Sequence, residues 1–198
     1  MARYSSLEFR YARPLARAIM TRPDFRRWIL ARTKYANVAA DSCPLPKFQA
    51  KMRNTREQRR WYWFNHFCRD TCSCQVEEWK PRDKRRTETD ILIILREPSG
   101  SNFAVHVEVK PPGDDFRKWQ AETYPRRAKC WSSPQTRPAT VLEHVGFATL
   151  LACGENLRDD TRIKSFDDVF YHDDIAKWIS PYPDLLDYRD RTSSRYFV

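Results

Sequence analysis

Two apolar runs separated by a turn sequence stand out in the middle of the chain. The first run is Ile91–Leu95, and the second extends from Phe103 to Val109. The residues between them include Pro98-Ser99-Gly100-Ser101, a composition typical of tight turns. Short runs of β-branched and aromatic residues on both sides of such a turn predict a β-hairpin.

Charged residues mark the open end of this predicted hairpin. If the turn is centred near Ser99, Asp90 lies opposite Glu108. Because side chains of a strand alternate between faces, Asp90, Glu108 and Lys110 then share one face. Two neighbouring carboxylates repel each other, and a hard divalent cation such as Mg²⁺ offsets this repulsion when it binds between them. A lysine beside them can stabilise charge that develops on a phosphate.

The region before the hairpin is expected to be mostly helical. Residues 1–53 have the pattern of a basic helical arm, which either contacts nucleic acid or packs on the core. Thr21 is expected to cap a helix that buries Trp28 and Ile29. A second helix is expected from Asn54 or Thr55 to about residue 68, followed by a strand at residues 72–79 and a charged loop at residues 80–87.

Three further elements are expected after the hairpin. They are a helix from Asp114 or Asp115 to about Lys129, a strand at Val145–Cys153, and a helix at Phe166–Trp178 with core residues Val169, Phe170 and Ile175. Residues 138–153 can alternatively form a helix closed by Gly154. The alternation of helices and strands predicts an α/β layered architecture. Its expected parts are the arm (1–53), the core (54–180) and a C-terminal tail (181–198).

The chain has 198 residues and a formal net charge of +10. Residues 1–89 hold 21 of the 36 Lys and Arg residues but only 9 of the 26 Asp and Glu residues. Such a positive field favours a polyanionic partner, and nucleic acid is the partner expected. No apolar run approaches the length of about 18 residues that spans a membrane, so no membrane partner is expected. Six cysteines without a secretion signal favour reduced thiols and an intracellular location, either cytoplasmic or nucleoid-associated.

The hairpin residues resemble the motif of the PD-(D/E)xK nuclease superfamily, whose members have the restriction-endonuclease-like fold. Glu108-Val109-Lys110 matches its Glu-x-Lys element, and Asp90 matches its preceding Asp, although Thr89 replaces the usual Pro. Gln120 and Tyr124 form a Gln-x-x-x-Tyr pattern like that of the RecB and phage-exonuclease branch. The resemblance covers about residues 54–154.

The resemblance implies a restriction-endonuclease-like core, in which a central mixed β-sheet is flanked by helices in the order αβββαβ, behind an N-terminal helical extension. It also implies a metal-dependent nuclease, for which DNA is the expected substrate. Asp90, Glu108 and the Val109 carbonyl would bind Mg²⁺ or Mn²⁺, Lys110 would assist attack by water, and Gln120 and Glu57 would complete the catalytic set. Glu57 is expected on a preceding helix, where it can equally offset the helix dipole or pair with a neighbouring arginine. The residues expected to contact nucleic acid are Arg82, Lys84, Arg85, Arg86, Arg117, Lys118, Tyr124, Arg126 and Arg127.

Two other functions are compatible with the same sequence. One is a nucleic-acid-binding module on a degenerate nuclease fold. The other is a protein-interaction module, for example a phage or mobile-element accessory factor. Its interface would use aromatic residues that look exposed, among them Tyr182, Tyr188, Tyr196 and Phe197. The sequence leaves the oligomeric state open, with a homodimer or a larger complex among the alternatives.

Overall fold

The computed structural model describes residues 6–52, 62, 64–66, 74 and 87–185. In chain order its elements are α1 (Ser6–Thr21), α2 (Pro23–Ile29), β1 (Cys43–Pro44), α3 (Pro46–Lys51), β2 (Phe64–His66), β3 (Thr87–Thr89), β4 (Ile91–Arg96), β5 (Asn102–Lys110), α4 (Gln120–Ser132), β6 (Gly146–Cys153), η1 (Glu155–Leu157), η2 (Thr161–Ser165), β7 (Asp168–Tyr171) and α5 (His172–Ala176).

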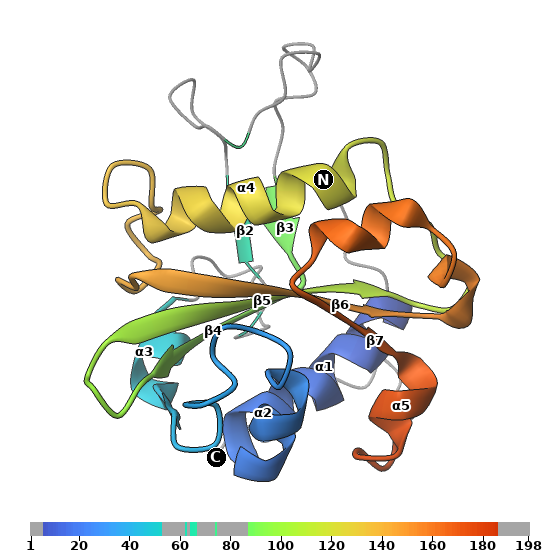
Figure 1. Ribbon diagram of the computed structural model, residues 1–198, viewed down its shortest axis with the longest axis horizontal. Coiled ribbons are helices and arrows are strands. Elements are labelled where there is room, and N and C mark those ends of the chain that lie inside the picture. The colour runs from blue at the N-terminus through green and yellow to red at the C-terminus, as the bar shows by residue number, and fades with distance from the viewer. Residues whose placement is uncertain (1–5, 53–61, 63, 67–73, 75–86, 186–198) are drawn as a thin grey trace.

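A five-stranded mixed sheet forms the centre of the molecule, with strand order β1-β4-β5-β6-β7 (Figure 1). β4 runs antiparallel to β1 and β5, whereas β6 runs parallel to β5 and β7. β2 and β3 form a separate two-stranded antiparallel sheet. Helices cover both faces of the main sheet, which confirms the predicted α/β class with a mixed sheet flanked by helices.

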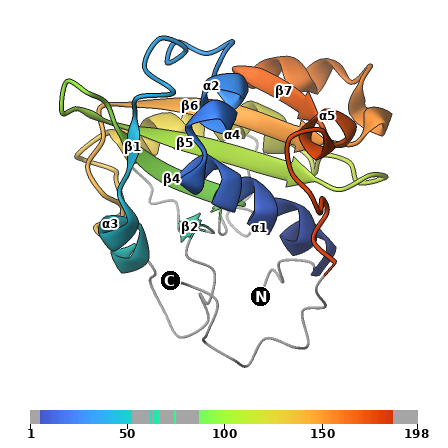
Figure 2. The ribbon, with the colours of Figure 1, turned by 90° about the horizontal axis from the view of Figure 1, so that it is seen from below.

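Each face of β5 packs against a different helical layer. Val105 and Val107 belong to one hydrophobic cluster with Leu15 of α1, whereas Ala104 belongs to another with Trp131 of α4. Figure 1 shows α4 above the sheet and α1 and α2 below it, and Figure 2 shows α1 lying across the lower face. Covering on both faces explains why β4 consists almost entirely of apolar residues.

The predicted hairpin is confirmed with its register. Ile91 pairs with Val107 and Arg96 pairs with Asn102, so the pairing is symmetric about Ser99. Gly100 has a φ of 95°, a conformation that glycine adopts without strain. The two strands therefore end together at the charged residues that the sequence placed there.

The helices before the sheet are part of the core. Leu15, Ile19, Phe25 and Ile29 belong to the same hydrophobic cluster as residues of β4, β5 and β6. Of the two alternatives for the N-terminal region, the structure therefore supports packing for α1 and α2. The predicted cap at Thr21 is wrong: the residue at the start of α2 is Arg22, and its side chain makes no capping hydrogen bond.

Two predicted helices include residues that form strands instead. Phe64–His66 is β2, paired with Thr87–Thr89, so the helix predicted to reach residue 68 is wrong at these positions. The helix predicted at residues 166–178 is wrong at Asp168–Tyr171, which pairs with β6, and is confirmed at His172–Ala176. In β7, Val169 packs against the hydrophobic cluster between the sheet and α4, whereas Phe170 belongs to the cluster between the sheet and α1. Adjacent residues point to opposite faces of the sheet in this way because side chains of a strand alternate.

The helix after the hairpin begins later than expected. Residues 111–119 form a loop, and α4 starts at Gln120 instead of Asp114 or Asp115. The strand predicted at residues 145–153 is confirmed as β6, so the helical alternative for this segment is wrong. The boundary drawn at residue 53, most of the helix expected at residues 54–68, and the strand expected at residues 72–79 apart from Cys74 lie outside the described residues, as do residues 186–198 of the tail.

Candidate active site

Asp90 lies immediately before β4, at the position where the antiparallel ladder with β5 ends. Extending the register by one residue places it opposite Glu108. Its Oδ2 atom accepts a hydrogen bond of 2.8 Å from the backbone N–H of Val109. If β4 were longer, a backbone carbonyl of β4 would accept this hydrogen bond. The Asp90 carboxylate accepts it instead, and this contact holds the Asp90 side chain beside β5.

Glu108 and Lys110 lie two residues apart on β5 and point to the face that α4 covers. Lys110 Nζ is 3.3 Å from Glu108 Oε1, and both side chains are about 95% buried, with 5% and 4% exposed. The ammonium also lies 5.8 Å from the centre of the Phe116 ring. A buried ion pair of this kind is held by its surroundings as much as by its own attraction.

Gln120, the first residue of α4, reaches back to Glu108. Its Nε2 donates a 2.5 Å hydrogen bond to Glu108 Oε1, while its Oε1 accepts one of 3.0 Å from the backbone N–H of Arg117. Glu108 Oε1 therefore forms the ion pair with Lys110 and accepts the hydrogen bond from Gln120. Among the described residues, no hydrogen bond reaches Glu108 Oε2.

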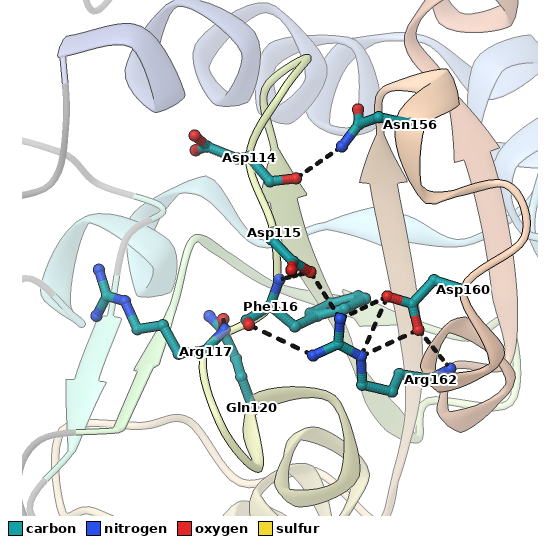
Figure 3. A network of polar contacts seen from close by, with 8 residues as sticks. All are labelled: Asp114, Asp115, Phe116, Arg117, Gln120, Asn156, Asp160 and Arg162. Atoms are coloured by element: carbon teal, nitrogen blue, oxygen red, sulfur yellow. Dashed lines mark hydrogen bonds and ion pairs between the residues drawn. The ribbon is translucent and has the colours of Figure 1, made fainter.

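The loop at residues 111–119, which delivers Gln120, is fastened by two side chains from distant parts of the chain (Figure 3). The Asn156 side chain accepts a hydrogen bond of 3.1 Å from Gly113 N. It also donates one of 2.9 Å to Asp114 O, which Figure 3 shows. Arg162 is held by Asp160 and donates to Asp115 Oδ1 at 2.7 Å.

The last residue of this loop, Trp119, has a φ of 64°, an uncommon conformation for a residue with a side chain. Backbone strain of this kind persists only where the surroundings enforce it. The fastened loop therefore sets where α4 starts and where Gln120 points.

Burial disfavours the charged form of both carboxyl groups. The pKa of Asp90 lies well above its ordinary value, first because the group is buried and second because Glu108 is close. Burial also raises the pKa of Glu108, although Lys110 and Arg127 oppose the rise. A bound cation would relieve this unfavourable charge.

Two acidic residues near the site were missed by the sequence analysis. Glu8 of α1 contributes repulsion that raises the pKa of Asp90, Glu108 and Glu88. Glu88 of β3 also has a buried Oε1 atom without a hydrogen-bond partner in the described structure. An acidic residue in a first helical turn normally offsets the helix dipole, so nothing in the local pattern indicates that Glu8 lies near β5.

The residues expected to contact nucleic acid divide into two groups. Arg117, Lys118 and Arg126 are exposed around the start and outer side of α4, and Figure 3 shows the Arg117 side chain pointing away from the Arg162 network. Tyr124 and Arg127 lie in the interior, with the guanidinium 4.5 Å from the centre of the tyrosine ring.

The interior pair has structural contacts of its own. Arg127 donates to the carbonyl oxygen of Glu88. Burial, then the charge of Glu108, raises the pKa of Tyr124 well above its ordinary value. The remaining candidates, Arg82, Lys84, Arg85, Arg86 and Glu57, lie outside the described residues.

The donor atoms fit Mg²⁺ or Mn²⁺. Asp90 and Glu108 supply carboxylate oxygens, and the Val109 carbonyl faces the same edge of β5 as its N–H, toward Asp90. Within the described ranges, no three Asp, Glu, His or Cys side chains form a metal-binding group by themselves. Mg²⁺ commonly binds through one or two carboxylates and keeps several waters, so a pair of carboxylates meets its needs.

Comparisons with protein-family models, with curated proteins and with solved structures gave no match for this chain. In the part of the chain that the structure describes, no helix combines the length and apolar character needed to cross a membrane. Any assignment of function therefore depends on the residues and contacts described above.

Proposed function

We propose that this chain is a metal-dependent nuclease with a restriction-endonuclease-like core, which hydrolyses phosphodiester bonds of nucleic acid, with DNA as the expected substrate. The observation that carries the proposal is the convergence of Asp90, Glu108, Lys110 and Gln120 at the shared end of β4 and β5. This is the residue set of the PD-(D/E)xK pattern, brought together by a hairpin whose register is fixed.

Each residue has a role that follows from its contacts. Asp90, Glu108 and the Val109 carbonyl would hold the cation, which when bound supplies Lewis-acid assistance and a more acidic water. Lys110 would stabilise negative charge that develops on the phosphate. Gln120 holds Glu108 in one orientation, and the fastened loop before α4 holds Gln120.

The surroundings also favour a nucleic-acid substrate. Arg117, Lys118 and Arg126 form an exposed basic surface on the same side of the sheet as the carboxylates. Cations arranged in this way bind phosphates and position a strand without reading its sequence. Glu8 is a further candidate for the acidic set, in the role that the sequence analysis gave to Glu57.

A second candidate is a nucleic-acid-binding module that has kept this fold without catalysis. Burial favours it: as whole residues, Asp90, Glu108 and Lys110 are 6%, 3% and 4% exposed, which restricts the approach of a phosphate. The ion pair and amide contact at Glu108 Oε1 would then serve stability alone.

Single-turnover cleavage of labelled DNA separates the two candidates. In Mg²⁺ or Mn²⁺, we expect Lys110→Ala to slow hydrolysis by about 10²-fold or more, because a charge that acts on the transition state is lost. The loss of DNA affinity in this variant should be no larger than the contribution of a single phosphate contact. The matched control is Lys164→Ala, which removes the same charge from an exposed position whose side chain makes no hydrogen bond or ion pair with the described residues.

Because Lys110 is buried, Lys110→Met serves as a second variant that keeps its packing on Phe116. Thermal melts establish that both variants are folded. Equal cleavage by wild type and both Lys110 variants would contradict the catalytic role. A wild-type protein that binds DNA but cleaves neither DNA nor RNA with either metal would favour the binding module.

A further inference from the structure

A hollow with a volume of about 400 Å³ lies between α1 and the segment that follows α5. Its charged lining consists of Arg13, Arg17, Arg22 and Asp184. Both walls belong to the layer below the sheet, on the face opposite α4 (Figures 1 and 2). It is therefore separate from the candidate active site.

Arginines of α1 and of the junction between α1 and α2 hold the segment after α5 at both of its ends. Arg22 Nη1 donates to Trp178 O at 2.6 Å. At the other end, Arg10 Nε donates to Asp184 O at 2.7 Å, and Asp184 N donates to Arg10 O at 2.9 Å. Arg13 forms an ion pair with the Asp184 carboxylate. Between these two attachments the segment passes over α1 without closing on it, which leaves the hollow.

The middle of the hollow holds a cation that the described structure does not neutralise. Arg17 is exposed, and none of the described residues forms a hydrogen bond or ion pair with its guanidinium. Arg13 is paired with Asp184, and Arg22 is paired with Asp24 at 2.6 Å. Burial, with a smaller contribution from the charge of Arg17, lowers the pKa of Arg13, which indicates repulsion between the two cations.

We propose that this hollow binds a phosphate group, with Arg17 as its principal ligand and Arg13 and Arg22 at its sides. A guanidinium offers a planar fork of N–H donors that matches phosphate oxygens in pairs. The volume lies in the range of small-molecule sites, and apolar residues such as Ala18 and Ile179 complete the lining. The phosphate belongs either to a free nucleotide-sized ligand or to a nucleic-acid strand.

Isothermal calorimetry in EDTA tests this site without metal, and so independently of the proposed nuclease activity. The probes are inorganic pyrophosphate, adenosine monophosphate and a short single-stranded DNA oligonucleotide. Arg17→Gln is compared with Arg27→Gln, which removes the same charge from an exposed position on α2 outside the hollow. We expect Arg17→Gln to weaken binding by about tenfold or more, and Arg27→Gln by less than about twofold.

The probes identify the source of the phosphate. A selective loss for pyrophosphate or the nucleotide assigns the site to a free ligand, whereas a loss confined to the oligonucleotide assigns it to a strand. Equal weakening by Arg17→Gln and Arg27→Gln would show that only overall charge matters and would overturn the proposal. The absence of saturable binding of all three probes to wild type would overturn it too. Since Arg17 is exposed, both variants should melt at the wild-type temperature.

Discussion

His172 connects the end of β5 to the segment after α5, and its burial makes the fold sensitive to acid. Its Nε2 lies 2.9 Å from the backbone oxygen of Lys110, its Nδ1 lies 2.8 Å from the Tyr182 hydroxyl, and its ring centre is 4.2 Å from that of Tyr11. Burial lowers the pKa of His172 from 6.5 to about 4, although the Lys110 carbonyl and Asp173 oppose the shift. The folded protein therefore keeps this ring neutral at pH values where the unfolded chain protonates it.

The sign and size of the effect follow from this difference. Above the unfolded pKa of about 6.5, the ring is neutral in both states and the full stability is present. As the pH falls toward the folded pKa of about 4, the unfolded state gains a proton that the folded state does not, and stability is lost. A shift from about 6.5 to about 4 corresponds to about 3 kcal/mol.

Urea unfolding of wild type and His172→Gln at pH 7.5 and pH 4 isolates this contribution. The variant should be less stable at pH 7.5, because it loses the ring contacts. Its deficit relative to wild type should shrink by about 3 kcal/mol at pH 4, because it has no imidazole to protonate. Other buried groups, such as His106 and Asp90, titrate in both proteins and cancel in the comparison. Stability curves that run parallel across this pH range would refute the reasoning.

Two further predictions concern the loop before α4 and the basic surface. Asn156→Ala removes both hydrogen bonds that Asn156 makes to the loop, so hydrogen exchange at Gly113 N should become faster by at least about tenfold, while exchange within β5 stays unchanged. Equal rates in both proteins would mean that Asn156 does not fasten the loop. The slope of log K against log salt for duplex DNA is negative, and Arg117→Gln and Arg126→Gln should each reduce its magnitude by about 0.9. A wild-type affinity independent of salt would rule out contacts of these exposed arginines with the DNA backbone.

The hairpin was predictable because local information was enough to specify it. Asp90 and Glu108 are joined by a short turn, and the period of two along each strand fixes which side chains share a face. The same local pattern placed Lys110 beside Glu108, and the spacing of Gln120 predicted a helix residue nearby. These features needed only the turn centre and the alternation of faces.

Other parts of the site depend on contacts between distant residues, which a single sequence does not reveal. Asn156 and Arg162 act on the loop at residues 111–119 from more than 40 positions away, and they delay the start of α4. β7 forms because it pairs with β6, although the spacing of Phe166, Val169 and Phe170 suits a helix equally well. Glu8 approaches the carboxylates only because α1 packs below the sheet.

The most direct test of the central claim is a Mn²⁺ titration followed by electron paramagnetic resonance of the free ion. We expect one saturable site in wild type, its loss in Asp90→Asn and in Glu108→Gln, and its retention in Lys110→Met, because the lysine is not a ligand. Affinity should increase with pH, since the raised pKa values of both carboxyl groups make protons compete with the metal. Binding that survives in both carboxylate variants, or no saturable binding in wild type, would contradict a metal site at the shared end of β4 and β5.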